Sequence, residues 1–199
     1  MLRKITERIE KIPQFYLIVL AHFIYYSGYF LTNHLKIFEL HELPFIFREE
    51  SIPLVSWTSV IYLSAAIMSP LAMFLIKQPH LGKVIVSGAG MVAVAMAAFI
   101  IYPIAYPREK NTDDFLLHLI RSADEPSNCC PSLHVAACFF LSLCLWRFSG
   151  KRTSLLFLLW SAAITISTLT TKQHYILDIM AGGLLAVIFA WLATRKQTR

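Results

Sequence analysis

Long runs of apolar residues, separated by short polar segments, dominate the chain, and only the last of the six longest runs contains a charged residue, Asp178. A helix rises 1.5 Å per residue, so about 20 apolar residues cross the ~30 Å hydrocarbon layer of a membrane. The pattern therefore predicts six transmembrane helices, of which the fourth and fifth are at the short end of the usual range. The predicted spans are Phe15–Thr32, Ile52–Ile76, Val84–Ala105, Pro131–Trp146, Ser154–Thr171 and Tyr175–Ala193.

Composition agrees with this pattern. Hydrophobic residues make up 57% of the 199-residue chain and charged residues 15%, with a mean hydropathy of +0.59, whereas a soluble domain has about 25% charged residues. The first apolar run lacks a small-residue cleavage site, so we expect a retained span and not a removed signal peptide. We predict an all-α polytopic membrane protein with one six-helix domain over residues 1–199.

The net charge of +6 first raises the question of nucleic-acid binding. We exclude that partner because the basic residues form short clusters between apolar runs and follow no continuous face. Lys and Arg accumulate on the cytoplasmic side of membrane proteins, and six spans place both termini on one side. Twelve of the 18 Lys and Arg residues fall on that side, which predicts cytoplasmic termini: Arg3, Lys4, Arg8, Lys11, Lys77, Lys83, Arg147, Lys151, Arg152, Arg195, Lys196 and Arg199.

The four cysteines predict neither a disulfide framework nor a structural metal. Cys129 and Cys130 are adjacent, and a bridge between neighbours is strained. Cys138 and Cys144 lie within an apolar run, which is typical of small buried side chains. No C-x-x-C spacing suited to zinc occurs.

The fourth apolar run begins with a candidate anion-binding motif, Cys130-Pro131-Ser132-Leu133-His134. Free N–H groups and the helix dipole at a helix start favour an anion. The Ser132 hydroxyl can add a hydrogen bond, and His134 can act as a general acid. The alternative is a simple N-cap followed by an interfacial histidine.

The sixth run begins with a candidate nucleophile. His174 and Asp178 are four residues apart, so a helix places both on one face. A carboxylate at this spacing can hold one imidazole nitrogen and leave the other free to attack, and Lys172 adds a cation nearby. The alternative is a His–Asp bond that only locks helices, but an Asp within a span is costly without a use.

Arg108, where the third run ends, offers a planar fork of donors suited to phosphate. Taken alone, an interfacial Arg that reaches lipid headgroups is the simpler interpretation. Lys110 and Arg121 follow in the next polar segment, as ordinary surface charges or, less simply, as groups that steer a phosphate. The predicted topology places all of these residues on the extracytoplasmic side.

Arg108, Pro131-Ser132-Leu133-His134 and His174-x-x-x-Asp178 together resemble the type 2 phosphatidic acid phosphatase superfamily in order and spacing. The motifs cover the second half of the chain, and the six-span layout covers nearly all of it. The sequence differs where the family has a Lys (Ile101), a Pro (Glu109) and a Ser-Arg pair (Ser167-Thr168). Within the superfamily it is similar to the branch that contains inositol phosphorylceramide synthases and small bacterial relatives.

The resemblance implies a metal-independent phosphoryl transfer at the outer membrane surface. His174, oriented by Asp178, would attack phosphorus and form a phosphohistidine, while His134 would protonate the leaving oxygen and then activate water. The implied phosphate-binding residues are Arg108, Lys172 and Ser132. No cofactor is expected, because cations can stabilise the phosphoryl oxygens.

The function expected from this resemblance is a lipid phosphatase in a bacterial inner membrane, with its active site facing the periplasm or exterior. Its partners would be the bilayer and a lipid phosphate: phosphatidic acid, phosphatidylglycerol phosphate, a polyprenyl diphosphate or a lipid A phosphate. If a lipid or sugar hydroxyl replaces water, the same site is a phosphotransferase. The alternative of another class is a non-catalytic lipid carrier or scaffold. The sequence predicts no oligomeric state.

Overall fold

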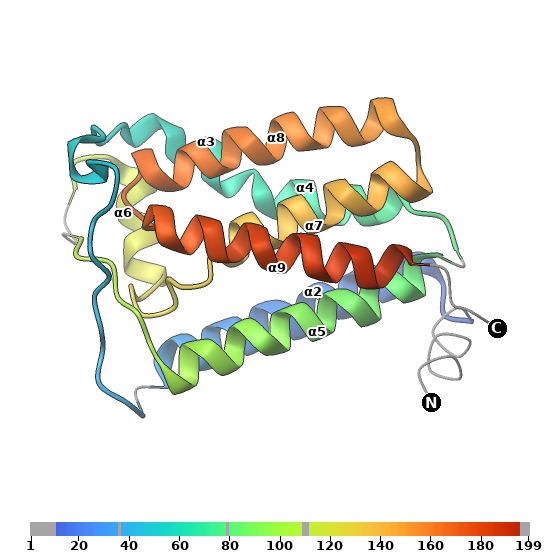
Figure 1. Ribbon diagram of the computed structural model, residues 1–199, viewed down its shortest axis with the longest axis horizontal. Helices are drawn as coiled ribbons and strands as arrows, with labels where there is room; N and C mark the ends of the chain where they lie inside the picture. The colour runs from blue at the N-terminus through green and yellow to red at the C-terminus, as the bar shows by residue number, and fades with distance from the viewer. Residues whose placement is uncertain (1–10, 36, 79, 109–111, 196–199) are drawn as a thin grey trace.

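The computed structural model describes residues 11–35, 37–78, 80–108 and 112–195. Within these residues, every secondary-structure element is a helix. The longer helices lie roughly parallel and form one bundle (Figure 1). The helices are α2 (Gln14–His34), α3 (Ser59–Leu63), α4 (Ala65–Leu75), α5 (His80–Ile101), α6 (Phe115–Ala123), α7 (Leu133–Phe148), α8 (Lys151–Thr170) and α9 (Ile176–Thr194). Two short 3₁₀ turns, η1 (Glu49–Ser51) and η2 (Ser56–Thr58), precede α3.

Each predicted span corresponds to one helix, except the second, which corresponds to η2, α3 and α4 together, and the ends differ by up to four residues. Five segments are long and apolar enough to cross a membrane: α2, the continuous stretch Ser56–Leu75, α5, α8 and α9. The predicted fourth span is α7, which has only 16 residues. The all-helical membrane fold is therefore confirmed, and the count of six spans stays a prediction.

Helix α7 is the central helix of the bundle, which explains how a short helix holds its place. Its 16 residues span ~24 Å, and it contacts α4, α5, α8 and α9. Small polar side chains join it to α8: the Ser142 and Ser161 hydroxyls are 3.0 Å apart, and the Ser154 hydroxyl donates to the Ser142 carbonyl at 2.7 Å. A helix surrounded by protein in this way does not itself need to match the thickness of the lipid.

Large apolar side chains are exposed on the outward faces of the other helices. Water would penalise so extended an apolar surface, whereas lipid tails accept it. The outward faces thus fit an integral membrane protein. Examples are Phe15, Val19, Phe23, Ile67, Val94, Leu155, Leu156, Leu159, Met180, Leu184, Val187 and Trp191.

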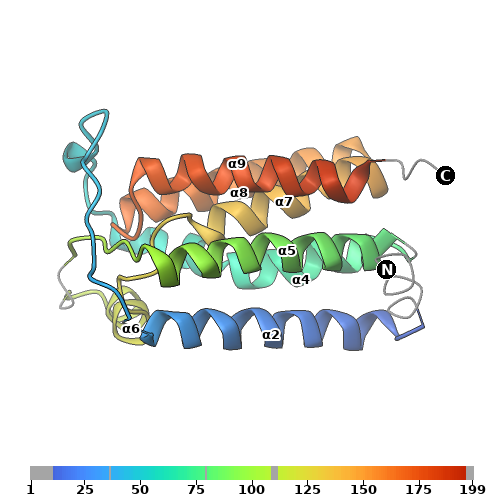
Figure 2. The ribbon, with the colours of Figure 1, turned by 60° about the horizontal axis from the view of Figure 1, so that its bottom comes forward.

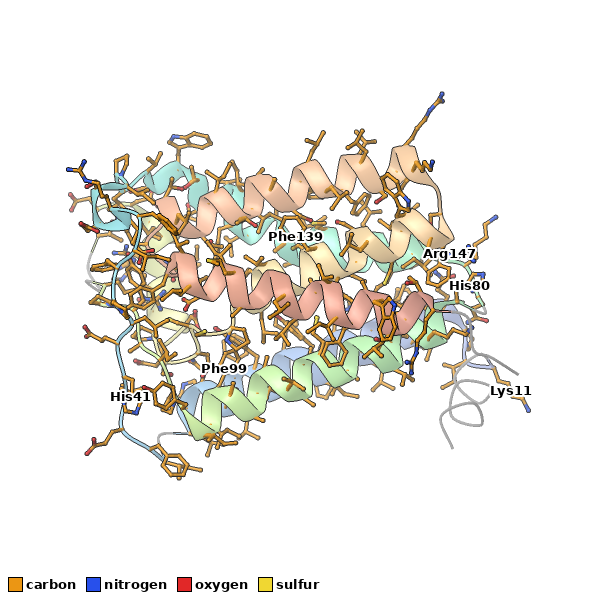
Figure 3. The ribbon with its side chains drawn as sticks, viewed as in Figure 1. Lys11, His41, His80, Phe99, Phe139 and Arg147 are labelled. Carbon is orange, nitrogen blue, oxygen red and sulfur yellow. The ribbon has the colours of Figure 1, made fainter. Side chains whose placement is uncertain are left out.

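The two ends of the bundle differ in character. Lys11 and Arg147, both assigned to the cytoplasmic side by the charge pattern, lie at one end, and His41 lies at the other (Figure 3). The tail residues Arg3, Lys4, Arg8, Lys196 and Arg199, and the outer-side Lys36, lie outside the described residues. The grouping of Lys11 with Arg147 agrees with the predicted topology, whose orientation stays a prediction.

Three polar segments cover the end of the bundle that contains His41. The segment between α2 and α3 runs across this end (Figure 2). Isolated β-bridges pair His41 with Ile104 and Ile104 with Asn128, so the segments before α3, after α5 and before α7 lie side by side. Helix α6 lies in the polar segment between α5 and α7. The Asp114 carboxylate caps this helix by accepting from Leu117 N at 2.8 Å.

The starts of α7 and α9 meet under this cover. The Ser132 backbone N–H, at the N-cap of α7, donates to the Asp178 carbonyl at 3.0 Å. Gly182 allows this approach, because a Cβ there would collide with the Ser132 carbonyl oxygen, whereas a Cβ on Gly183 would meet no atom within 4 Å. The two predicted motifs are thus side by side because one glycine leaves room for the backbone of α7.

Candidate active site

His174 precedes α9 and has one ring nitrogen fixed by the protein. Its Nδ1 lies 3.0 Å from the Cys129 carbonyl oxygen and 3.2 Å from Asp178 Oδ2. Both partners are acceptors when Asp178 is ionised, so Nδ1 carries the proton. The lone pair of a neutral ring is then on Nε2, which is the arrangement that a nitrogen nucleophile needs.

Asp178 joins the start of α9 to His174. The carboxylate is fully buried, and its Oδ2 also accepts from the Tyr175 N–H at 2.9 Å. This bond satisfies a backbone donor at the first turn of the helix, where a negative charge is also favoured by the dipole. One carboxylate therefore caps the helix and orients the imidazole. The contact with His174 was predicted from the four-residue spacing, but His174 lies before the helix and not on one of its faces.

A small cavity opens beside His174 and is bounded by residues from four parts of the chain. It brings His174 and Arg108 together, which the sequence predicted from their shared side of the membrane. Its lining consists of Tyr29, Tyr62, Arg108, Asp124, Glu125, Pro126, Asn128, Cys129, Gln173 and His174.

Arg108 is held in the cavity wall by Asp124. Its guanidinium donates to the Asp124 carbonyl, and Nη2 lies 3.8 Å from Asp124 Oδ2. The Arg108 side chain is only 3% exposed, so it is no lipid-facing surface residue. A buried guanidinium beside an imidazole nucleophile can bind the oxygens of a phosphoryl group.

His134 contacts two residues that line the cavity, Tyr62 and His174. Its ring is 6.0 Å from the His174 ring and packs on Tyr62 at 4.2 Å between centroids. His134 is half-buried and is not among the cavity-lining residues. The two histidines are neighbours, as predicted, but only His174 faces the cavity in this arrangement.

Ser132 and Lys172, the other predicted phosphate ligands, have protein partners. Ser132 is fully buried, and its hydroxyl accepts from Val135 N at 3.5 Å as the N-cap of α7. The Lys172 ammonium donates to the Glu49 carbonyl at 3.3 Å, from a residue with a left-handed backbone (φ 56°). Neither residue lines the cavity, so each would have to leave its present contact to reach a phosphate there.

Of the two cations in the outer segment before α7, only Arg121 can be placed, because Lys110 lies outside the described residues. Arg121 is not a surface charge: it is 5% exposed, and its guanidinium donates to the Thr171 carbonyl at 3.1 Å. This contact supports the turn that leads into His174.

All four cysteines are free thiols. Cys129, His174 and Asp178 offer ligand atoms within 4.8 Å of one another, a spacing that could suit a metal ion. The Cys129 thiol instead donates to the Pro126 carbonyl, at 3.0 Å, and burial raises its pKa well above the ordinary value. A metal ligand must be a thiolate, so this trio fits a metal poorly.

Sequence reasoning missed four residues that shape the site. Tyr29, Tyr62 and Asp124 line the cavity, and the Glu49 carboxylate accepts from Ile176 N, at 2.8 Å, at the start of α9. The two tyrosines lie inside predicted spans. The two acids lie in the polar segments between predicted spans. The only sequence signal for the two acids is their predicted side of the membrane, and several residues outside the site share that side.

Comparison with known proteins places this geometry in a family. The model of the PAP2 superfamily matches residues 16–192, which includes every cavity-lining residue. Members are typically phosphoesterases or phosphotransferases, so the match supports an enzyme of this general type that acts on lipids. The searches of curated proteins and of solved structures found no match. Since the match covers most of the chain, the protein belongs to the PAP2 (type 2 phosphatidic acid phosphatase) superfamily.

Proposed function

We propose that the protein is an integral membrane lipid phosphatase that works through a phosphohistidine on His174. The observation that carries this proposal is that His174, fixed by Asp178, lines one cavity together with the buried Arg108. Asp178 and the Cys129 carbonyl hold the protonated nitrogen, so Nε2 is available for attack on phosphorus.

The first chemical step transfers the phosphoryl group to the protein. His174 Nε2 forms a bond to phosphorus, the bond to the leaving oxygen breaks, and His134 gives its proton to that oxygen. Arg108 neutralises charge on the phosphoryl oxygens, with Lys172 and Ser132 as further ligands if they leave their present partners. Positioning and charge supply most of the catalysis in phosphoryl transfer, and this scheme uses no metal ion.

The proposed setting is a bacterial inner membrane with six spans, cytoplasmic termini and the cavity at the extracytoplasmic surface. The excess of Lys and Arg on one side supports this orientation. The substrate is a lipid phosphate monoester or diphosphate of the phosphatidic acid, phosphatidylglycerol phosphate, polyprenyl diphosphate or lipid A type. A lipid enters such a site from the plane of the bilayer, with its headgroup at the polar end of the bundle.

Phosphate release from these lipids by purified protein in EDTA tests the proposal. The wild-type protein should release phosphate, vanadate should inhibit as a transition-state mimic, and His174→Ala should be inactive. His118→Ala is the matched control, because this exposed histidine lies on α6 of the same outer segment. Transfer of a phospho-headgroup without phosphate release would favour the phosphotransferase. No reaction from folded protein would favour the non-catalytic carrier.

A further inference from the structure

The cavity contains a tyrosine hydroxyl that the phosphohistidine scheme above does not use. Tyr29 and Tyr62 both line the cavity beside Arg108 and His174. The Tyr29 hydroxyl donates to Asp124 Oδ1 at 2.8 Å, so its proton already has an acceptor. Within the described residues, the Tyr62 hydroxyl has no hydrogen-bond partner, although Tyr62 is only 4% exposed. The Tyr62 oxygen is not one of the fully buried unpaired polar atoms either, so it is open to a ligand in the cavity.

Helix α3, which carries Tyr62, is held at both ends by α8. At its start, the hydroxyls of Thr58 and Thr170 are 2.8 Å apart. Just after its end, the Ser64 hydroxyl accepts from the Trp160 indole N–H at 2.8 Å. Helix α8 leads directly into the turn that precedes the proposed nucleophile. The tyrosine and the nucleophile are therefore positioned by the same helix.

The ring and the hydroxyl of Tyr62 have different neighbours. The ring packs on the imidazole of His134, with centroids 4.2 Å apart. Arg108 and Asp124 are among the charged groups that act electrostatically on the hydroxyl, and both also line the cavity. A substitution that removes only the hydroxyl can therefore be distinguished from one that also removes the support of His134.

A phosphoryl group in this cavity needs more donors than Arg108 alone supplies. Three equatorial oxygens carry the charge of the transition state, and the fork of one guanidinium pairs with two oxygens at most. Asp124 already accepts from that guanidinium, and Lys172 and Ser132 have protein partners. A tyrosine hydroxyl is a suitable further donor, because it can be aimed at a phosphoryl oxygen without adding a buried charge.

We infer that Tyr62 is a further catalytic residue, whose hydroxyl donates a hydrogen bond to a phosphoryl oxygen beside Arg108. This role rests on the proposed function. The hydroxyl keeps its proton throughout, so the bonds that form and break, and the roles of His174 and His134, are those given above. The hydrogen bond strengthens as negative charge grows on the phosphoryl oxygen, so it stabilises the transition state more than the bound substrate.

The test removes the hydroxyl and keeps the ring. Full-length Tyr62→Phe in detergent micelles is compared with wild type and with Tyr25→Phe, a half-buried tyrosine of α2 outside the cavity lining. Phosphate release is measured with phosphatidic acid and with p-nitrophenyl phosphate, and so is inhibition by vanadate. We expect the kcat of Tyr62→Phe to fall about 100-fold on both substrates, the effect of losing one donor to an oxyanion. Vanadate inhibition should weaken by a similar factor, and Tyr25→Phe should behave like wild type.

The two substrates separate a phosphate ligand from a residue that acts through His134. Both present the same phosphoryl oxygens, but only phosphatidic acid has a leaving oxygen that needs a proton. A loss confined to phosphatidic acid would overturn the inference, because Tyr62 would then only position His134. Tyr62→Leu removes the ring contact as well, so it should lose further activity on phosphatidic acid and little more on p-nitrophenyl phosphate.

Normal kcat and normal vanadate inhibition in Tyr62→Phe would overturn the inference and leave the proposed function intact. A large fall in the melting temperature of Tyr62→Phe, or its failure to fold, would also overturn the inference, because the hydroxyl would then be needed by the protein itself. Release of phosphate by folded wild type without a phosphorylated His174 would contradict the proposed phosphohistidine but not the role of Tyr62. No release from any substrate by folded wild type would overturn both.

Discussion

The starts of α7 and α9 each place a histidine beside the same cavity, but the two imidazoles are held very differently. His174 has Nδ1 fixed by Asp178 and the Cys129 carbonyl. Within the part of the chain that the structure describes, His134 has ring contacts with Tyr62 and His174 and no hydrogen bond. A nucleophile benefits from a lone pair with a fixed direction, whereas a residue that gives up a proton benefits from freedom to turn toward the atom that receives the proton.

The largest predicted effect removes the orientation of His174. Asp178 Oδ2 accepts from both the Tyr175 N–H and His174 Nδ1. In Asp178→Asn the amide oxygen that keeps the Tyr175 N–H carries no negative charge to hold the imidazole, and an amide nitrogen at that position would donate to Nδ1 and favour the tautomer with its proton on Nε2. We expect phosphate release to fall about 10³- to 10⁴-fold, with a much smaller change in melting temperature. A modest loss of activity would show that Asp178 matters for the helix and not for the imidazole.

Substrates with different leaving groups distinguish the roles of His134 and His174. Alkoxide leaving groups, as in lipid phosphates, need a proton, whereas p-nitrophenolate does not. His134→Ala should therefore lose about 10²- to 10⁴-fold on phosphatidic acid and far less on p-nitrophenyl phosphate. His174→Ala should lose both activities alike. Equal losses for the two substrates in His134→Ala would remove the assignment of His134 as the acid.

Sequence reasoning located both helix starts because that information is local. The contact predicted between Asp178 and His174 exists, at 3.2 Å, but its geometry differs from the prediction. His174 lies before the N-cap Tyr175, and Asp178 reaches back to it from the first turn of α9, so the two residues do not share a helix face. The all-helical membrane architecture followed from apolar runs, which record the lipid environment directly.

The rest depends on contacts between distant segments, which no local pattern contains. Asp124 reaches the cavity because α2 binds the segment before α7, and Glu49 reaches α9 across 127 positions. Lys172 was expected to bind phosphate from its place in sequence, but its left-handed backbone accompanies a contact with Glu49. The short length of α7 is tolerated because other helices surround it, a property of packing and not of hydropathy.

An intermediate effect is expected from the contact between the two helix starts. Gly182→Ala places a methyl group against the Ser132 carbonyl, so α7 and α9 must separate. Overpacking of this kind costs about 1–3 kcal/mol, and displacement of His134 from His174 should lower activity as well. Melting temperature and phosphate release would be measured together. Gly183→Ala is the matched control, because its methyl group meets open space and Ala favours a helix. Equal losses in both variants would argue against a close-contact effect.

The smallest effect is a pH dependence at Asp124. Its neighbours are the charged groups of Arg108 and Glu125 and the imidazole of His174, and the Tyr29 hydroxyl donates to it. Burial raises the pKa of Asp124 in the folded protein, so its stabilising contribution is fully present below the ordinary pKa and is lost as pH rises through the raised value. The melting temperature of wild type relative to Asp124→Asn should thus decrease between pH 4 and pH 7. An increase over this range would mean that Arg108 outweighs burial.

The most direct test of the account locates the phosphate during turnover. Wild-type protein mixed with ³²P-labelled phosphatidic acid is quenched in alkali, digested, and its labelled peptide is identified by mass spectrometry. We expect phosphate on His174, just before α9, and no label in His174→Ala. Phosphate on His134, or steady release of phosphate with no labelled protein at any time, would contradict it.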